Sequence, residues 1–292
     1  MRLKPLFFII LSLSTSNKAY AQEQIKKNPE TNWTIGISGG ATAIEGNSDQ
    51  HFGSFSVSRD FGDAYAGISL THVDSGDVPG LINAVPASTT EVGLNAGTSF
   101  EALSFDVYLS VGKRNFDVES IERNGLMASI SSSGNAFGIG GAVNYDIPLS
   151  TSIFLTPSIA VDYNELDTAR IVQGPTGQQV AIENNENGVT GTFGLAAQKI
   201  FGNDSDHVGA ILANVVTTSN TTSFNPGTSQ SAVLRALATR DQPGQKDSWA
   251  EIGGAVSLAV APQLRLDISA LQTIGFLDTD ATSVSVGLRY SF

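Results

Sequence analysis

Residues 280–292 read DATSVSVGLRYSF and alternate strictly between two kinds of side chain. One parity consists of Thr282, Val284, Val286, Leu288, Tyr290 and Phe292, and the other of Ser283, Ser285, Gly287, Arg289 and Ser291. This period of two predicts a β-strand with one apolar and one polar face. A strand that ends on aromatic residues gains an interfacial anchor if it crosses a membrane, whereas a soluble domain gains little. The stretch therefore suggests a transmembrane barrel.

The amino-terminal residues 1–21 have the pattern of a secretory signal peptide. Arg2 and Lys4 precede an apolar core at 6–13, and Ala19 and Ala21 frame a small-x-small cleavage site. The apolar run is much shorter than the roughly 20 residues of a membrane-spanning helix. We expect cleavage after residue 21, a short periplasmic segment at 22–31 and a barrel domain at 32–292.

The rest of the chain has no apolar 18-residue stretch, so a membrane-spanning form must be a closed barrel. Cysteine is absent, which excludes disulfides and thiolate metal sites. Removal of 1–21 takes away three basic and no acidic residues; it leaves 13 basic and 28 acidic residues, a formal charge of −15. This acidity argues against nucleic acid as a partner.

The composition favours an all-β chain. Thirty glycines, together with abundant Ser, Thr and Val, disfavour helices. Middling hydropathy is typical of barrels, because each lipid-facing residue is followed by a lumen-facing polar one. No linker-like change of composition divides the mature chain, so we expect one domain.

Alternating stretches predict twelve antiparallel strands in an up-and-down barrel. We expect them near 33–38, 55–61, 64–73, 90–99, 103–112, 137–145, 153–163, 189–195, 207–217, 252–260, 264–269 and 280–292. The apolar parity of the ninth is ambiguous. Connections after even-numbered strands are short, and those after the third, fifth, seventh and ninth are long, at 74–89, 117–134, 165–186 and 219–247; the last of these includes a possible short helix at 232–238. An even strand number with alternating loop lengths is typical of bacterial barrels, with both termini in the periplasm.

Three stretches resemble the β-domain, or translocator, of autotransporters: LTPSIAVDY at 155–163, WAEIGGAVSLAV at 249–260 and the ending GLRYSF at 287–292. The resemblance covers the mature length and implies a Gram-negative outer-membrane barrel. It also implies that Tyr290 and Phe292 form the signal that the outer-membrane assembly machinery reads. An autotransporter carries a passenger before its first strand, whereas only residues 22–32 stand there, so we expect no passenger in this chain.

The polar parity predicts the lining of the barrel. Many of its residues are glycines, which we expect to leave space inside. The charged residues assigned to the lumen are Asp106, Arg114, Asp162, Glu251, Arg265, Asp267 and Arg289. A cross-strand ionic ladder of Arg265, Asp267 and Arg289 would hold the wall, whereas a selectivity constriction is the functional alternative. Mixed signs favour the structural interpretation.

An enzyme is the third possibility, because some outer-membrane barrels are hydrolases. The imidazole bases available are His51 beside Asp49 in the first outer loop, His72 at the rim of the third strand and His207 at a turn. None has a serine in a recognisable nucleophile context. We predict no catalytic residues, no cofactor and no metal site.

The sequence thus favours an outer-membrane barrel that forms a pore or conduit. The alternative is a structural or adhesive barrel with a closed lumen and surface-binding loops. Expected partners are outer-membrane lipid, lipopolysaccharide and the assembly machinery; the oligomeric state is left open.

Overall fold

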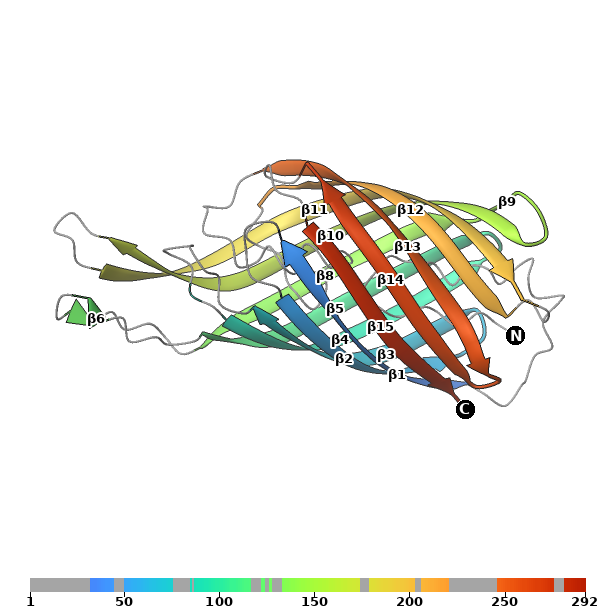
Figure 1. The fold of residues 1–292 in the computed structure, drawn as a ribbon, viewed down its shortest axis with the longest axis horizontal. Coiled ribbons are helices and arrows are strands. Elements are labelled where there is room, and N and C mark those ends of the chain that lie inside the picture. The colour runs from blue at the N-terminus through green and yellow to red at the C-terminus, as the bar shows by residue number, and fades with distance from the viewer. Residues whose placement is uncertain are drawn as a thin grey trace.

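The computed structural model describes residues 32–44, 50–75, 85, 87–116, 122–123, 126–127, 133–173, 179–202, 206–220, 246–275 and 281–292. Twelve long antiparallel strands in these ranges form one sheet that closes on itself (Figure 1), since β15 pairs with β1 and β10 pairs with β11. The wall strands are β1 (Trp33–Ile44), β2 (Gln50–Asp60), β3 (Ala64–Ser75), β4 (Ala87–Phe100), β5 (Leu103–Phe116), β8 (Ser133–Tyr145), β10 (Ile153–Gln173), β11 (Gln179–Phe201), β12 (His207–Thr218), β13 (Asp247–Ala261), β14 (Leu264–Ile274) and β15 (Ala281–Ser291).

Three two-residue strands complete the set. β6 (Glu122–Arg123) pairs with β7 (Leu126–Met127) in the connection between β5 and β8. β9 (Ile147–Pro148) pairs with the beginning of β10. The prediction of a twelve-stranded barrel is therefore confirmed, and each expected strand corresponds to one wall strand. Within the described ranges, no helix is long and apolar enough to span a membrane.

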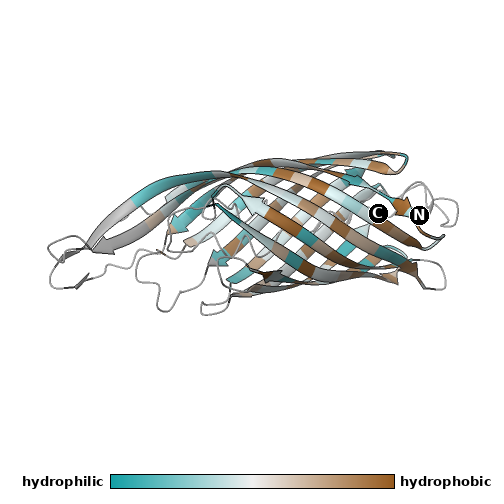
Figure 2. Ribbon diagram, turned by 90° about the horizontal axis from the view of Figure 1, so that it is seen from above, coloured by the Kyte–Doolittle hydropathy of each residue, from teal (hydrophilic) through white to brown (hydrophobic). Residues whose placement is uncertain are grey.

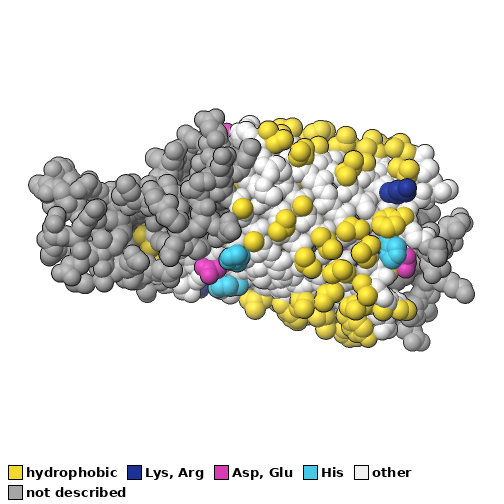
Figure 3. Space-filling view, viewed as in Figure 1, with side chains coloured by type: hydrophobic (Ala, Val, Ile, Leu, Met, Phe, Trp, Pro, Cys, Tyr) yellow, Lys and Arg dark blue, Asp and Glu magenta, His cyan; other side chains and the backbone are white. Residues whose placement is uncertain are grey.

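The two faces of the wall have opposite polarity. On β15, Val286 is 53% exposed and Leu288 40%, whereas Ser283 and Arg289 on the other parity are 0% and 4% exposed. Among the described residues, 37 large hydrophobic side chains are exposed, and the buried set holds 27 polar or charged residues against 20 apolar ones. Hydrophobic side chains gather on the visible face of the wall between its two ends (Figure 3), and hydrophobic and hydrophilic residues alternate along the strands (Figure 2). Such an inside-out arrangement suits a barrel whose outer face meets lipid.

The two ends of the barrel differ. At the end that contains Asn32 and Phe292, called here the terminal end, the connections between wall strands are 61–63, 101–102, 146–152, 202–206 and 262–263. The opposite end, called the far end, has the connections 45–49, 76–86, 117–132, 174–178, 219–246 and 275–280. The first terminal turn is tight, as predicted: Gly62 has φ 104° and donates its N–H to Asp60 Oδ1 at 2.7 Å.

The prediction of a loop at 165–186 is wrong, because most of this stretch belongs to β10 and β11. β10 and β11 continue through it as a paired ribbon that projects past the far end of the barrel (Figure 1). β10 pairs with β8 only as far as Leu166, and β11 pairs with β12 only from Thr190. From Asp167 to Gln173, β10 pairs along β11 alone, a length of roughly 23 Å at about 3.3 Å per residue. Ala169 at the base of the ribbon still belongs to a buried cluster with Phe116, whereas from residue 170 on the two ribbon strands pair only with each other.

Smaller differences concern strand ends. β1 extends to Ile44 and β2 begins at Gln50, so His51 lies in a strand and not in the first loop. β8 begins at Ser133, inside the loop expected at 117–134. Parity in β12 is now defined, because Leu212 and Val216 are buried while Ile211 and Val215 are exposed. The predicted signal peptide, the segment 22–31, Asp49, Asp280 and the possible helix at 232–238 lie outside the described residues.

Candidate functional site

The seven charged residues assigned to the lumen all lie on the inward parity of their strands. Arg114, Asp162, Glu251, Asp267 and Arg289 are buried, and Asp106 and Arg265 are half-buried. They do not form one cluster. The structure distributes them over several hydrogen-bonded groups along the inner wall.

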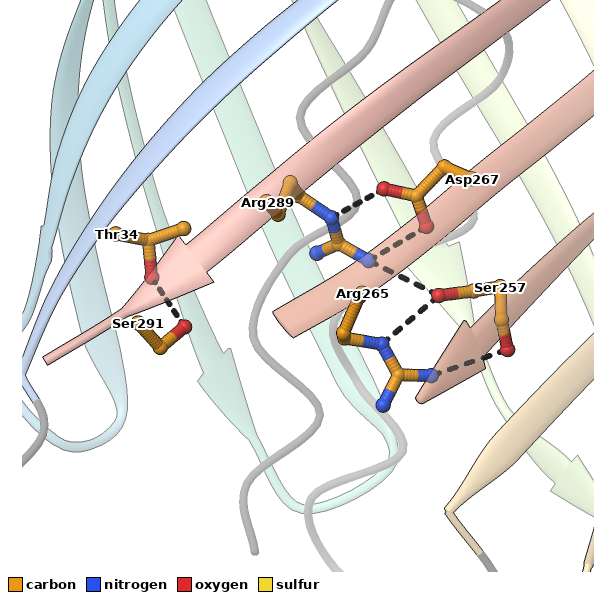
Figure 4. Close-up of polar contacts among 6 residues, drawn as sticks. All are labelled: Thr34, Ser257, Arg265, Asp267, Arg289 and Ser291. Carbon is orange, nitrogen blue, oxygen red and sulfur yellow. Dashed lines mark hydrogen bonds and ion pairs between the residues drawn. The ribbon is translucent and has the colours of Figure 1, made fainter. Parts of the chain in front are cut away.

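One group near the terminal end joins three strands (Figure 4). Arg289 of β15 donates from Nε to Asp267 Oδ2 at 2.5 Å and from Nη2 to Asp267 Oδ1 at 2.9 Å. A second Nη2 hydrogen bond reaches Ser257 Oγ of β13 at 3.1 Å. Arg265 donates instead to Ser257, from Nε to Oγ at 2.9 Å and from Nη2 to the carbonyl oxygen at 3.2 Å. The expected ladder is therefore an Arg289–Asp267 pair, with Arg265 held by a serine that the sequence analysis did not identify.

A tyrosine, a glycine and an aspartate on three successive strands form the second group. Tyr65 of β3 lies opposite Gly97 of β4, and Gly97 lies opposite Asp106 of β5. The Tyr65 hydroxyl crosses the glycine and donates to Asp106 Oδ1 at 2.5 Å. Asn144 of β8 donates to Asp106 Oδ2 at 3.2 Å and to Ser104 Oγ at 3.2 Å. Neutral donors thus hold this carboxylate.

The same arrangement recurs two strands further round the barrel. Tyr108 of β5 lies opposite Gly140 of β8, which lies opposite Asp162 of β10, and the Tyr108 hydroxyl donates to Asp162 Oδ1 at 2.5 Å. Asp106 and Tyr108 are two residues apart on β5, so both groups share that strand.

The inward glycines accommodate these aromatic rings. A Cβ added to Gly97 would lie 2.4 Å from Tyr65 Cε1, and one added to Gly140 would lie 2.8 Å from Tyr108 Cε1. Gly40 likewise lies under the ring of Phe52, 2.7 Å from the added atom. At Gly97 and Gly140 the expectation that glycine leaves open space is wrong, because a neighbouring tyrosine ring fills it.

Further polar groups line the wall between β8 and β13. Thr156 donates to Asp146 Oδ1 at 2.6 Å and accepts from Gln198 Nε2 at 3.0 Å. Glu251 receives hydrogen bonds from Asn214 Nδ2 at 3.0 Å and from Trp249 Nε1 at 3.1 Å. Of these six residues, the sequence analysis named only Glu251 among the charges of the lumen. The other residues that lie in strands are on the inward parity, and this alternation is the signal in the sequence that could have assigned them to the lumen.

An apolar cap covers the inner wall near the far end. Val85, Ala87, Phe116 and Ala169 form a buried cluster, and the Val85 N–H donates to the Ala169 carbonyl at 3.0 Å. Arg114 lies below it, with its guanidinium carbon 5.7 Å from the centre of the Phe116 ring. The hydrogen bond from Val85 to Ala169 joins the connection between β3 and β4 to the base of the ribbon.

The histidines lie apart from the inner wall groups. His51 lies opposite Asp74, and His72 Nδ1 is 2.8 Å from Thr90 Oγ1, all on the exposed side of the wall. His207 accepts the Ala259 N–H at Nδ1, at 3.1 Å. In the described ranges, no three His, Asp or Glu side chains come together as a metal site.

The carboxy-terminal residues close the barrel at its terminal end. Phe292 exchanges both backbone hydrogen bonds with Trp33, each at 3.0 Å. Tyr290 and Phe292 stack with ring centres 6.0 Å apart, and the Tyr290 hydroxyl donates to Gln263 Oε1 at 2.9 Å. Both rings of the proposed assembly signal are exposed on the outer face.

A closed antiparallel barrel with an apolar exterior and a polar interior defines an outer-membrane β-barrel. The profile of the autotransporter beta-domain family matches residues 24–270. The chain therefore belongs to the autotransporter β-domain family, and it is a translocator barrel of the Gram-negative outer membrane.

Solved structures have the same fold. The translocator domain of the autotransporter NalP from Neisseria meningitidis is similar over 93% of this chain and 92% of its own, with a TM-score of 0.61 and 13% identity. The β-domain of the Bordetella autotransporter BrkA is similar over 90% of this chain and 99% of its own, with a TM-score of 0.56 and 15% identity. No curated protein matched the sequence.

Proposed function

We propose that this translocator barrel provides a hydrated conduit across the outer membrane. The observation that supports the proposal is the composition of the inner wall, where polar and charged residues outnumber apolar ones among the buried side chains. An inner wall needed only for stability could be apolar, because well-packed apolar residues often replace buried ion pairs without loss of stability. A polar wall suits water and polar solutes.

Both termini are proposed to lie in the periplasm. Support comes from the short connections at the terminal end and the longer connections and ribbon at the far end. From the sequence pattern of the amino terminus, we propose that residues 1–21 are a cleaved signal peptide, that 22–31 form a periplasmic segment and that 32–292 form the barrel domain.

Conductance of the purified protein in planar lipid bilayers tests the conduit. Discrete channels are expected from protein that migrates as a heat-modifiable band, which reports the folded barrel. Folded protein that never conducts would overturn the proposal.

Single-cysteine variants locate the path, because the natural chain has no cysteine. Asn95 is half-buried on the inward parity of β4, and its neighbour Leu94 is 52% exposed on the outer face. A bulky thiol reagent is expected to reduce conductance of Asn95→Cys and to leave the matched Leu94→Cys control unchanged. Equal effects at both positions would argue against conduction through the lumen.

The ribbon is the observation that supports the second candidate function, in which the barrel has a closed lumen and binds surfaces through its outer segments. β10 and β11 extend beyond the wall, and at the base of this extension Asn185 links Glu165 and Asp167 through hydrogen bonds of 3.0 and 2.8 Å. Binding of purified lipopolysaccharide that disappears with the ribbon, in a barrel that never conducts, would favour this function. The conduit is preferred because it accounts for the whole inner wall.

Other partners follow from this placement. We propose outer-membrane lipid around the apolar band and the assembly machinery at Tyr290 and Phe292. We propose no catalytic role, since translocation is the function of the family and His51 and His72 belong to the outer face. Hydrolysis of lipid or peptide that is lost on substitution of either histidine would contradict this.

A further inference from the structure

An arginine occupies an unusual place on the outer face at the terminal end. Arg59, the second-last residue of β2, is exposed and lies directly opposite Trp33 of β1. Its guanidinium carbon is 5.3 Å from the centre of the Trp33 ring and 5.2 Å from that of Phe61. Both rings are exposed, at 39% and 60%. Arg59 therefore lies between two aromatic side chains at the edge of the apolar band.

The two rings attract the positive charge of Arg59, but they supply no oxygen to its five N–H groups. Within the described part of the chain, the interactions of Arg59 are these two ring contacts, without a hydrogen bond or an ion pair. The adjacent carboxylate of Asp60 accepts the Gly62 N–H and lies on the opposite parity. Within the described residues, the exposed N–H groups of Arg59 are therefore open to an oxygen acceptor from the surroundings of the barrel.

Lipid chemistry provides that acceptor at this depth. Aromatic residues and basic residues meet the headgroup region at the edge of the apolar band. A guanidinium matches the geometry of a phosphate through paired N–H donors. The exposed rings of Trp33 and Phe61 would lie beside the glycerol and the first methylene groups of the same lipid.

Another basic residue provides a contrast. Lys199 of β11 is also exposed on the outer face near the terminal end, two residues before Phe201. That ring packs instead against His207, with ring centres 5.4 Å apart, and Lys199 has no ring contact within the described chain. Position and charge alone therefore do not produce the arrangement around Arg59.

We propose that Arg59, held between Trp33 and Phe61, binds the phosphodiester group of a glycerophospholipid in the membrane leaflet at the terminal end. Trp33 also exchanges backbone hydrogen bonds with Phe292. The bound lipid therefore contacts the strand pair that closes the barrel.

The test uses the full mature chain, refolded in detergent micelles and titrated with dioleoylphosphatidylglycerol. Native mass spectrometry counts the retained lipid, and dioleoyl monogalactosyl glycerol serves as a phosphate-free lipid with the same chains. Arg59→Gln is expected to weaken retention of phosphatidylglycerol about tenfold, because it removes the paired, charge-assisted N–H donors to the phosphate. Phe61→Leu, which keeps the charge but removes one ring, is expected to weaken it less. The matched control Lys199→Gln is expected to retain lipid as the wild type does.

Three results of the lipid titrations would overturn the proposal. They are equal retention by Arg59→Gln and the wild type, equal retention of the galactolipid and the phospholipid, and an equal loss in Lys199→Gln. Displacement of the lipid by millimolar inorganic phosphate would also overturn it, since it would indicate a general anion site. If Arg59→Gln does not fold, Arg59→Lys and Phe61→Leu decide the question through the same titration.

Discussion

Arg289 and Asp267 lie on adjacent strands, and the guanidinium donates separate hydrogen bonds to the two oxygens of the carboxylate, at 2.5 and 2.9 Å. The Arg289 and Asp267 side chains are only 4% and 8% exposed. A buried pair of this kind is costly to break, because the remaining charge keeps its desolvation without its partner. Asp267→Ala is expected to lower the free energy of unfolding by about 3 kcal/mol, measured by urea titration in lipid vesicles.

The double variant Asp267→Leu with Arg289→Met distinguishes the loss of the ion pair from the cost of leaving one buried charge without its partner. It removes both charges, so we expect a stability close to that of the wild type. The control Arg265→Gln removes a charge whose hydrogen bonds go to Ser257, and a smaller loss is expected. A loss in that control as large as in Asp267→Ala would contradict a special role for the pair.

Gly97 tests the fit between tyrosine and glycine. An alanine Cβ there would lie 2.4 Å from the Tyr65 ring and 2.5 Å from Asp106 Oδ1, so the short hydrogen bond between them has to change. We expect Gly97→Ala to lower the free energy of unfolding by about 2 kcal/mol, from overpacking. In Gly191→Ala the nearest atom, of Thr217, is 3.6 Å away. Equal stability of the two variants in urea would show that the ring does not need the glycine.

Deletion of Phe292 tests the closing strand pair. It removes the backbone exchange with Trp33 and the stacking with Tyr290. We expect less heat-modifiable protein in the outer-membrane fraction than after any deletion within 221–245, a connection that follows β12. Equal assembly of the two kinds of variant would refute this prediction.

The ribbon can be shortened without disturbing the wall. Replacement of 170–182 by Asn-Gly removes pairs that β10 and β11 make only with each other. We expect a folded barrel with unchanged conductance and a change in stability within about 0.5 kcal/mol. Removal of Val161 alone, inside the wall, shifts the register with β8 and β11 and is expected to prevent assembly. A ribbon deletion that also prevents assembly would assign the ribbon to the folding of the wall.

The sequence alone determined the wall strands and, for most of them, which face is apolar. The reason is local: successive side chains of a strand point to opposite faces, so a two-sided environment is recorded as period two in the chain. β15 is the clearest example. β12 is the exception, because Val, Ile and Leu occur on both of its faces, with Leu212 buried and Ile211 exposed.

Only the tertiary structure decided which side chains meet. Tyr65 and Asp106 are 41 residues apart, and their contact depends on the register of β3 with β4 and of β4 with β5, which no local pattern records. The same holds for Ser257 between Arg265 and Arg289. The ribbon was missed because its strands are held by backbone pairing with each other and lie outside the two-sided wall. An alternation of period two therefore identifies a strand that has lipid on one side and the lumen on the other. Which side chains meet across neighbouring strands depends on the register of those strands in the folded barrel.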